Sequence, residues 1–173
     1  MFQWKNRKRG WIGIDFGSHS VKLAQGAFSG NRMEIQAAAV IPRGVPWTHD
    51  LATQEAATSS AGELDVAFFL NRNFSGTQSA CTLSMAACDV RRMTIPENAL
   101  RGALEHHVAR ALSSIDRFKG IGREFDFWET EKACSDTGPP ANVLSVPSFW
   151  AEQCISDTRE AGLDCDRLDG VPF

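Results

Sequence analysis

The sequence lacks cysteine pairs of the kind that hold metals or form disulfide frameworks. Its five cysteines are an odd number, and no two of them have CxxC spacing; they are Cys81, Cys88, Cys134, Cys154 and Cys165. This pattern argues against a zinc site and against a disulfide scaffold. Isolated cysteines are typical of a reducing compartment, where they pack as small apolar residues.

Long apolar runs and a strong excess of one charge are also missing. The apolar stretch 11–14, which follows a basic start, ends at once at Asp15, so we recognise no signal peptide and no segment of membrane-spanning length. The formal net charge of the 173 residues is −3, which gives the chain no general attraction to nucleic acid. We therefore expect a cytoplasmic protein with no nucleic-acid partner and no direct insertion into a membrane.

Alternation of apolar and polar residues predicts three strands at the start of the chain, over 11–15, 21–27 and 33–41. Turn residues separate these strands, so we expect an antiparallel three-stranded meander. More strands are predicted later in the chain, over 80–83, 89–95, 124–130, 142–146 and 165–168.

Helical spacing of apolar residues is clearest over 97–112, where Pro96 is expected in the first turn. A second helix is predicted over 148–161, with Ser148 as its N-cap and Gly162 as its C-terminal stop. A third helix, over 61–71, follows a loop rich in Pro, Gly, Thr and Ala.

The order of these elements, strands first and mixed elements later, predicts an α/β sheet domain with a smaller α+β subdomain inserted into it. We place the first part of the sheet domain at 1–77, the inserted subdomain at 78–130 and the return to the sheet domain at 131–173.

The residues between the first two strands are suited to binding phosphate. The stretch Gly13–Lys22 reads GIDFGSHSVK. Gly17 lets the backbone approach a ligand and is expected to adopt a positive φ, so that the amides of Gly17, Ser18 and His19 can converge on a phosphate oxygen. The hydroxyls of Ser18 and Ser20 can add further donors.

Two charged residues accompany this turn. Asp15, at the end of a strand, can hold a hydrated Mg²⁺, which prefers a carboxylate plus waters. Lys22, on the same strand face as Ser20, can meet a β- or γ-phosphate as a point charge. The alternative is a plain β-hairpin with a Gly/Ser turn. The pattern is not a Walker P-loop, because GKS and GKT are absent and a strand follows the turn.

The stretch Gly13–Gly26 resembles the first phosphate motif of the actin/Hsp70/sugar-kinase superfamily. Within that superfamily the chain resembles the PilM family of type IV pilus assembly proteins, because further stretches match in the same order: Arg91–Pro96, Glu124–Phe127, Asn142–Pro147 and Ala161–Asp169. His19 departs from the family pattern, which has a small residue there. The resemblance implies part of an actin-like (ribonuclease H-like) ATPase domain with an inserted α+β subdomain.

The resemblance also implies a ligand and partners. It implies binding of ATP and Mg²⁺ at Asp15, Gly17, Ser18, His19, Ser20 and Lys22. It further implies a groove, between the sheet domain and the inserted subdomain, for the cytoplasmic tail of the inner-membrane pilus protein PilN. Such a protein would connect the membrane complex to the pilus motor ATPases, would lie at the inner membrane through its partners, and would not need to turn ATP over.

The family continues for about as many residues again, including the second phosphate motif and the adenosine motif. We therefore expect this chain to be a partial product that binds ATP weakly or not at all. No catalytic residue is assigned. Three alternatives stay open: a small-molecule (sugar) kinase, an FtsA-like cell-division filament protein, and a type II secretion component of the same fold. Asp169 would be the candidate base of a kinase, whereas the family match places it in a turn after a strand.

Overall fold

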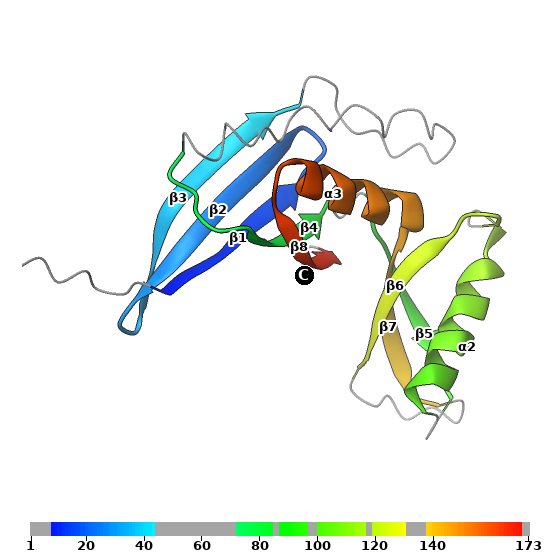
Figure 1. Cartoon of the computed structure of the whole chain (residues 1–173). Coiled ribbons are helices and arrows are strands. Elements are labelled where there is room, and N and C mark those ends of the chain that lie inside the picture. The colour runs from blue at the N-terminus through cyan, green and yellow to red at the C-terminus, as the bar shows by residue number, and fades with distance from the viewer. Residues whose placement is uncertain are drawn as a thin grey trace, which may run out of the picture. The chain divides into compact units, whose positions relative to one another are not determined.

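The computed structural model of the chain describes residues 8–43, 72–84, 87–96, 100–116, 119–130 and 138–170 (Figure 1). The helix predicted over 61–71 lies outside these residues. The chain divides into two compact units. The core unit comprises residues 1–86 and 152–173, and the inserted unit comprises residues 87–151.

The core unit is built on a five-stranded sheet with the strand order β3-β2-β1-β4-β8. The first three strands form the predicted antiparallel meander, whereas β4 is parallel to β1 and β8 is parallel to β4. The strands are β1 (Lys8–Phe16), β2 (Ser20–Ser29), β3 (Arg32–Pro42), β4 (Gln78–Leu83) and β8 (Asp164–Gly170).

Alternate residues of these strands form the core of the sheet. On β1, Ile12, Ile14 and Phe16 are buried, and the residues between them are not. This period of two is what a strand with one covered face produces. Residues 152–160 of α3 (Ser148–Glu160) belong to the core unit, and here the Thr158 hydroxyl lies 3.5 Å from the Cys81 thiol of β4. Gly162 follows with a φ of +77°, which confirms it as the C-terminal stop.

The inserted unit packs one helix against a three-stranded antiparallel sheet with the order β5-β7-β6. Buried Val108 and Leu112 of the helix meet Val143 of the central strand, and Phe125 and Phe127 close the layer. The elements are β5 (Asp89–Thr94), α2 (Arg101–Ser113), β6 (Arg123–Glu129) and β7 (Pro140–Pro147).

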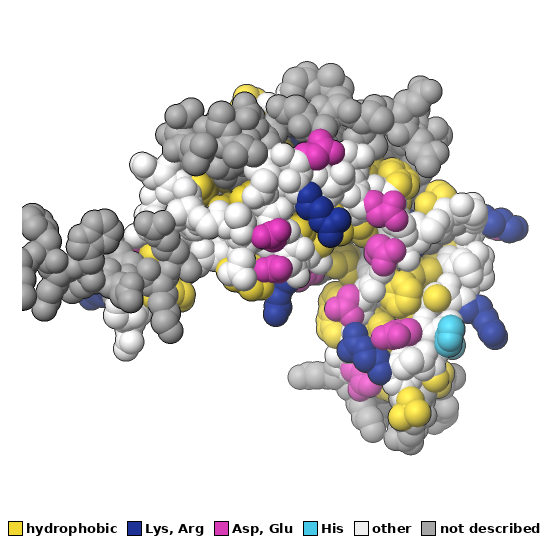
Figure 2. All heavy atoms as spheres, in the orientation of Figure 1, with side chains coloured by type: hydrophobic (Ala, Val, Ile, Leu, Met, Phe, Trp, Pro, Cys, Tyr) yellow, Lys and Arg dark blue, Asp and Glu magenta, His cyan; other side chains and the backbone are white. Residues whose placement is uncertain are grey.

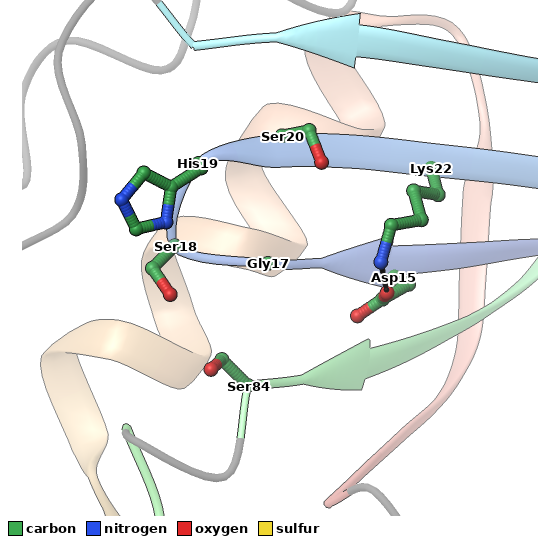
Figure 3. Close-up of a pocket in the computed structure, with 7 residues that line it drawn as sticks. All are labelled: Asp15, Gly17, Ser18, His19, Ser20, Lys22 and Ser84. Atoms are coloured by element: carbon green, nitrogen blue, oxygen red, sulfur yellow. Dashed lines mark hydrogen bonds and ion pairs between the residues drawn. The ribbon is translucent and has the colours of Figure 1, made fainter.

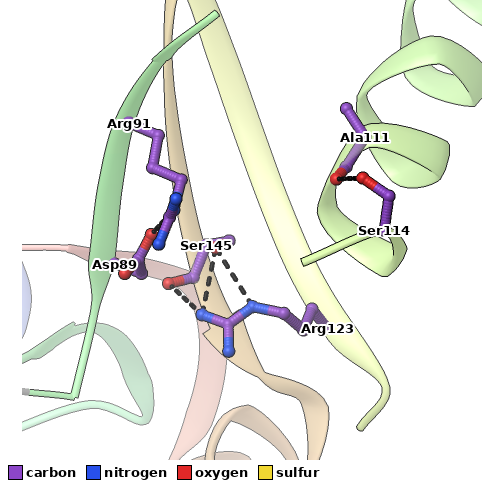
Figure 4. Close-up of polar contacts among 6 residues, drawn as sticks. All are labelled: Asp89, Arg91, Ala111, Ser114, Arg123 and Ser145. Atoms are coloured by element: carbon purple, nitrogen blue, oxygen red, sulfur yellow. Dashed lines mark hydrogen bonds and ion pairs between the residues drawn. The ribbon is translucent and has the colours of Figure 1, made fainter. Parts of the chain in front are cut away.

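Polar side chains on the three strands of the inserted unit also bind one another (Figure 4). The Arg123 guanidinium donates to the hydroxyl of Ser145 (3.1 and 3.0 Å) and to its carbonyl (3.0 Å). Arg91 Nε donates to Asp89 Oδ1 at 2.6 Å. The bonds from Arg123 satisfy the hydroxyl and the carbonyl of Ser145, which is 1% exposed. Buried polar groups without such partners would destabilise the unit.

The limits of the two units differ from the predicted insertion at 78–130. The strand Gln78–Leu83 pairs with β1 in the core sheet, and the strand Pro140–Pro147 is the centre of the inserted sheet. Apolar patterns show which face of a strand is buried, but they do not show which strand is its neighbour, especially when the pairing is parallel and distant in sequence. The return to the core unit therefore occurs inside α3 and not at 131.

Two predictions for the helix starts are wrong. The first turn of α2 begins at Arg101, after Leu100 in an extended conformation, so Pro96 is not in it. Ser148 is the first residue of α3 and not its N-cap. Its amide donates to the Gly122 carbonyl (2.8 Å), and its hydroxyl donates to Glu124 (3.0 Å). Among the described residues no helix is long and apolar enough to cross a membrane.

Buried thiols connect β4, β8 and α3. Burial raises the pKa of the Cys81 thiol to about 12, and it raises the pKa of Cys154 well above its ordinary value. The Cys81 sulfur lies 3.5 Å from that of Cys165. Both Cys81 and Cys154 are at most 1% exposed, so the folded state holds them in the neutral form.

These thiols predict a loss of stability at high pH. Unfolded thiols ionise near pH 9 whereas Cys81 stays protonated to about pH 12. The stabilisation is therefore complete below pH 9 and is lost as the pH rises. Between these values the free energy of unfolding of wild-type protein should fall more steeply than that of Cys81→Ala, by up to about 1.4 kcal/mol per pH unit. Urea unfolding under reducing conditions measures both slopes, and the absence of tyrosine removes one competing titration. Equal slopes would contradict the assignment.

Candidate functional site

The predicted phosphate motif forms the tip of the hairpin between β1 and β2. Phe16 pairs with Val21, and Asp15 pairs with Lys22 on the next rung. Phe16 and Val21 point into the core, with exposed fractions of 0% and 1%. Because side chains alternate along a strand, Asp15 and Lys22 must project from the opposite face. The buried rung thus determines where the two charged side chains lie.

A cavity of about 320 Å³ lies at this tip (Figure 3). All six residues that the sequence singled out line it, together with Ser84, which follows β4: Asp15, Gly17, Ser18, His19, Ser20, Lys22 and Ser84. Ser84 is not among the predicted site residues; its amide donates to the Phe16 carbonyl at 3.3 Å. No local pattern marks it, because it reaches the cavity through the parallel pairing of β1 with β4, which brings both strand ends to the edge of the sheet where ligands of α/β proteins bind.

Gly17 has a steric role and not the predicted conformational one. Its φ is not among the positive values of the described glycines. A Cβ atom on Gly17 would instead lie 2.8 Å from the Ser20 carbonyl oxygen, closer than real contacts allow. The tight turn therefore requires glycine because two parts of the backbone approach each other.

Asp15 and Lys22 form an ion pair across the hairpin. Lys22 Nζ donates to Asp15 Oδ2 at 3.1 Å (Figure 3). Their side chains are 35% and 58% exposed, so water screens the pair and its contribution to stability is small. Breaking the pair is therefore easy, and a ligand carrying phosphate and a divalent cation would give each side chain an opposite charge.

The donor set fits Mg²⁺ only together with a nucleotide. Among the described residues no group of three or more His, Cys, Asp and Glu is arranged to hold a metal ion. Mg²⁺ normally keeps several waters and binds through one or two carboxylates plus substrate phosphates. Asp15 is one such carboxylate at the cavity, whereas Asp169 does not line it. The Asp169 Oδ1 atom accepts the Gly170 amide at 2.7 Å inside β8.

Arg43, just after β3, contacts the hairpin from outside the predicted motif. Its Nε atom donates to the Gly17 carbonyl at 2.8 Å, and its amide donates to the His19 carbonyl at 2.9 Å. Arg43 lies in the loop that the sequence predicts before the helix at 61–71, and no role is predicted for it. No local pattern marks it, because both contacts span more than twenty residues.

Comparison with known proteins identifies the fold. No family model and no curated protein matches the sequence. Among solved structures, a chain of the PilM–PilN type IV pilus biogenesis complex superposes with a TM-score of 0.66 at 20% identity, over 92% of this chain and 47% of that chain. The cytoplasmic domain of EpsL, an inner-membrane component of the type II secretion system of Vibrio cholerae, superposes with a TM-score of 0.59 at 14% identity, over 96% and 60%.

The predicted actin-like fold class and the resemblance to PilM are confirmed at the level of the fold. The chain spans about half the length of the pilus protein chain that it matches.

The steric role of Gly17 is testable. Gly17→Ala should displace the turn and lower the free energy of unfolding by about 1–3 kcal/mol, the usual cost of overpacking. The matched control is Gly13→Ala on the same strand, because a Cβ atom there would lie 3.6 Å from the Ala24 carbonyl oxygen, an ordinary contact. Urea unfolding compares the two variants, and equal effects would show that the contact at Gly17 is not limiting.

Proposed function

We propose that the chain is part of a cytoplasmic, ATP-binding scaffold protein of the type IV pilus machinery, held at the inner membrane through its partners. The observation that carries this proposal is the phosphate hairpin and its cavity, set in a fold shared with a chain of the PilM–PilN complex. No turnover of ATP is required for such a role, and no catalytic residue is proposed.

The nucleotide would bind with its phosphates at the hairpin. The amides of Gly17, Ser18 and His19 and the hydroxyls of Ser18 and Ser20 are the proposed phosphate donors, and Lys22 the proposed counter-charge. Asp15 would hold Mg²⁺ through water, and the ion would neutralise charge on the phosphates. The cavity is open and polar, which suits the phosphate end of a nucleotide and gives no apolar slot for adenine.

The partner would be a peptide segment of a membrane protein, by analogy with PilN in the complex that the fold resembles. We propose that the inserted unit binds this peptide. The inserted unit has its own helix, sheet and core, and the core sheet is complete without any strand from it. On β6, Trp128 is 43% exposed. Exposed aromatic side chains are enriched in protein interfaces. Charges of both signs are interspersed over the visible surface (Figure 2), so shape and apolar contact would dominate recognition.

A second candidate is a component of a type II secretion system. The similarity to the EpsL cytoplasmic domain favours it. Both candidates share the scaffold role, and they differ in the membrane protein that is bound.

The nucleotide proposal predicts weak binding by this chain. The chain spans about half the length of the pilus protein chain that it matches, and the cavity is open, so these residues by themselves should bind Mg-ATP weakly, with shifts confined to the amides of the hairpin in a heteronuclear NMR titration. In a longer version of the protein, Asp15→Ala should weaken Mg-nucleotide binding far more than the control Asp169→Ala, which removes a carboxylate outside the cavity. Micromolar affinity of the present chain in calorimetry would contradict the weak binding, and equal effects of the two substitutions would contradict the site.

The partner proposal predicts peptide binding through the inserted unit. In a longer version of the protein, fluorescence anisotropy should detect binding of the cytoplasmic N-terminal peptide of a pilus membrane protein. Trp128→Ala should weaken that binding, whereas Met33→Ala, an exposed apolar residue of β3 in the core unit, should not. Preference for the corresponding secretion-system peptide would select the second candidate. Absence of binding together with sugar-dependent ATP turnover would select the kinase alternative.

A further inference from the structure

Arg43 is a charged residue held beneath the tip of the hairpin. It is only 8% exposed although it directly follows the edge strand β3. Two of its nitrogen atoms bind the turn: Nε donates to the Gly17 carbonyl (2.8 Å), and the backbone N donates to the His19 carbonyl (2.9 Å). The residues Gly17, Ser18 and His19 make up the whole connection between β1 and β2. Arg43 therefore determines the direction of two carbonyl groups of this turn.

These two contacts also determine the direction of two amides. A trans peptide unit is planar, so the N–H of one residue points opposite to the C=O of the residue before it. With the carbonyls of Gly17 and His19 directed at Arg43, the N–H groups of Ser18 and Ser20 point away from it. Ser18 and Ser20 line the cavity and Arg43 does not. Arg43 thus lies behind the turn, and the amides face the other way.

The charge of Arg43 also acts on the helix α3. The positive charge of Arg43 lowers the pKa of the Cys154 thiol of α3, while burial and the negative charge of Asp157 raise it. Both charges therefore act on the same buried site of the helix. Asp157 is 1% exposed and accepts a hydrogen bond from Gln153 Nε2 at 2.6 Å. The charge of Arg43 therefore lies close enough to α3 to act on the buried Cys154 thiol.

We infer that Arg43 is a positioning residue that holds the hairpin amides ready for a phosphate group, and that Gly17 makes the required turn sterically possible. This inference rests on the proposed function and deepens it. Preorganised donors bind an anion without losing conformational entropy at that moment. A disordered Gly/Ser turn would have to be ordered by the ligand itself.

The variants must separate positioning from simple stabilisation. Arg43→Met keeps the apolar stem and removes the guanidinium, and Arg43→Lys keeps a charge but loses the planar fork. The matched control is Gln25→Met. Gln25 is 3% exposed, and its amide group donates to the carbonyls of Gly10 (3.0 Å) and Ser75 (2.7 Å) and accepts from the Ser75 amide (3.0 Å). It lies on the same sheet, four residues along β2 from Val21.

The experiment uses isotope-labelled chain without ligand and then with pyrophosphate or Mg-ATP. In the ligand-free chain, Arg43→Met should increase amide hydrogen exchange and lower the order parameter at Ser18, and Arg43→Lys should do so less. Ser20 should change less than Ser18, because the bond to the His19 carbonyl comes from the backbone amide of residue 43, which both variants keep. In the titration, the apparent affinity obtained from the shifts of the hairpin amides should be about tenfold lower for Arg43→Met than for wild-type protein, as expected for loss of a charge-assisted hydrogen bond. Gln25→Met should lose stability and leave both readouts unchanged.

The outcomes are distinguishable. Unchanged hairpin amides in ligand-free Arg43→Met, or an equal loss of affinity in Gln25→Met, would overturn the inference. If Arg43→Met does not fold, Arg43→Lys decides by the same two readouts. Absence of any shift at Ser18, His19 and Ser20 in the wild-type titration would overturn the proposed function instead, whatever Arg43 does to the free hairpin.

Discussion

The placement of β1 between β2 and β4 is the constraint on which the rest of the core unit depends. Ile14 faces Leu23 on one side and Cys81 on the other, and all three are buried. A slip of one residue would turn the apolar set outward and bring Asp15 into the core. An unpaired carboxylate in that position is strongly unfavourable. Burial of one face therefore sets the register, and the register presents Asp15 and Lys22 together at the cavity.

The parts of the site that could be predicted from sequence are those built from neighbouring residues. The hairpin from Gly13 to Lys22 contains its own strand pattern and turn, so its six lining residues were identified together. Ser84 and Arg43 were missed because strand pairing brings them in from far along the chain. The same reason explains the displaced unit boundary: the patterns predict strands over 80–83 and 142–146, close to the observed β4 and β7, but they do not show which strands pair. The sequence predicts that glycine is needed at position 17, but for the wrong reason. Gly17 does not have a positive φ; glycine is needed because a Cβ atom would lie too close to the Ser20 carbonyl oxygen.

Three buried polar side chains of the core unit, those of Arg43, Gln25 and Ser79, bind backbone carbonyl groups. Arg43 binds the turn, Gln25 binds the segment before β4, and the Ser79 hydroxyl donates to the Asp164 carbonyl at 2.9 Å. The Ser79 bond reinforces the pairing of β4 with β8, whereas Arg43 and Gln25 also reach chain outside the strands, at the hairpin turn and at Ser75. Buried polar groups are tolerated only with such partners, and a satisfied one specifies a unique arrangement. At the hairpin the same device has a consequence beyond stability, because the direction of a carbonyl also fixes the direction of the next amide.

This arrangement bears on why a scaffold would bind a nucleotide without needing to hydrolyse it. A ligand stabilises the state that it binds in proportion to the logarithm of its concentration over its dissociation constant, about 2.7 kcal/mol at a hundredfold excess. It biases a conformation only if it binds that conformation better than the others. Under the proposed function, the phosphate hairpin on one wall would meet this condition, because its donors would gain a full set of contacts only when a second wall lies over the same ligand. Occupancy would then hold the two walls together, and chemistry at the phosphate would add nothing to the contact that a partner recognises.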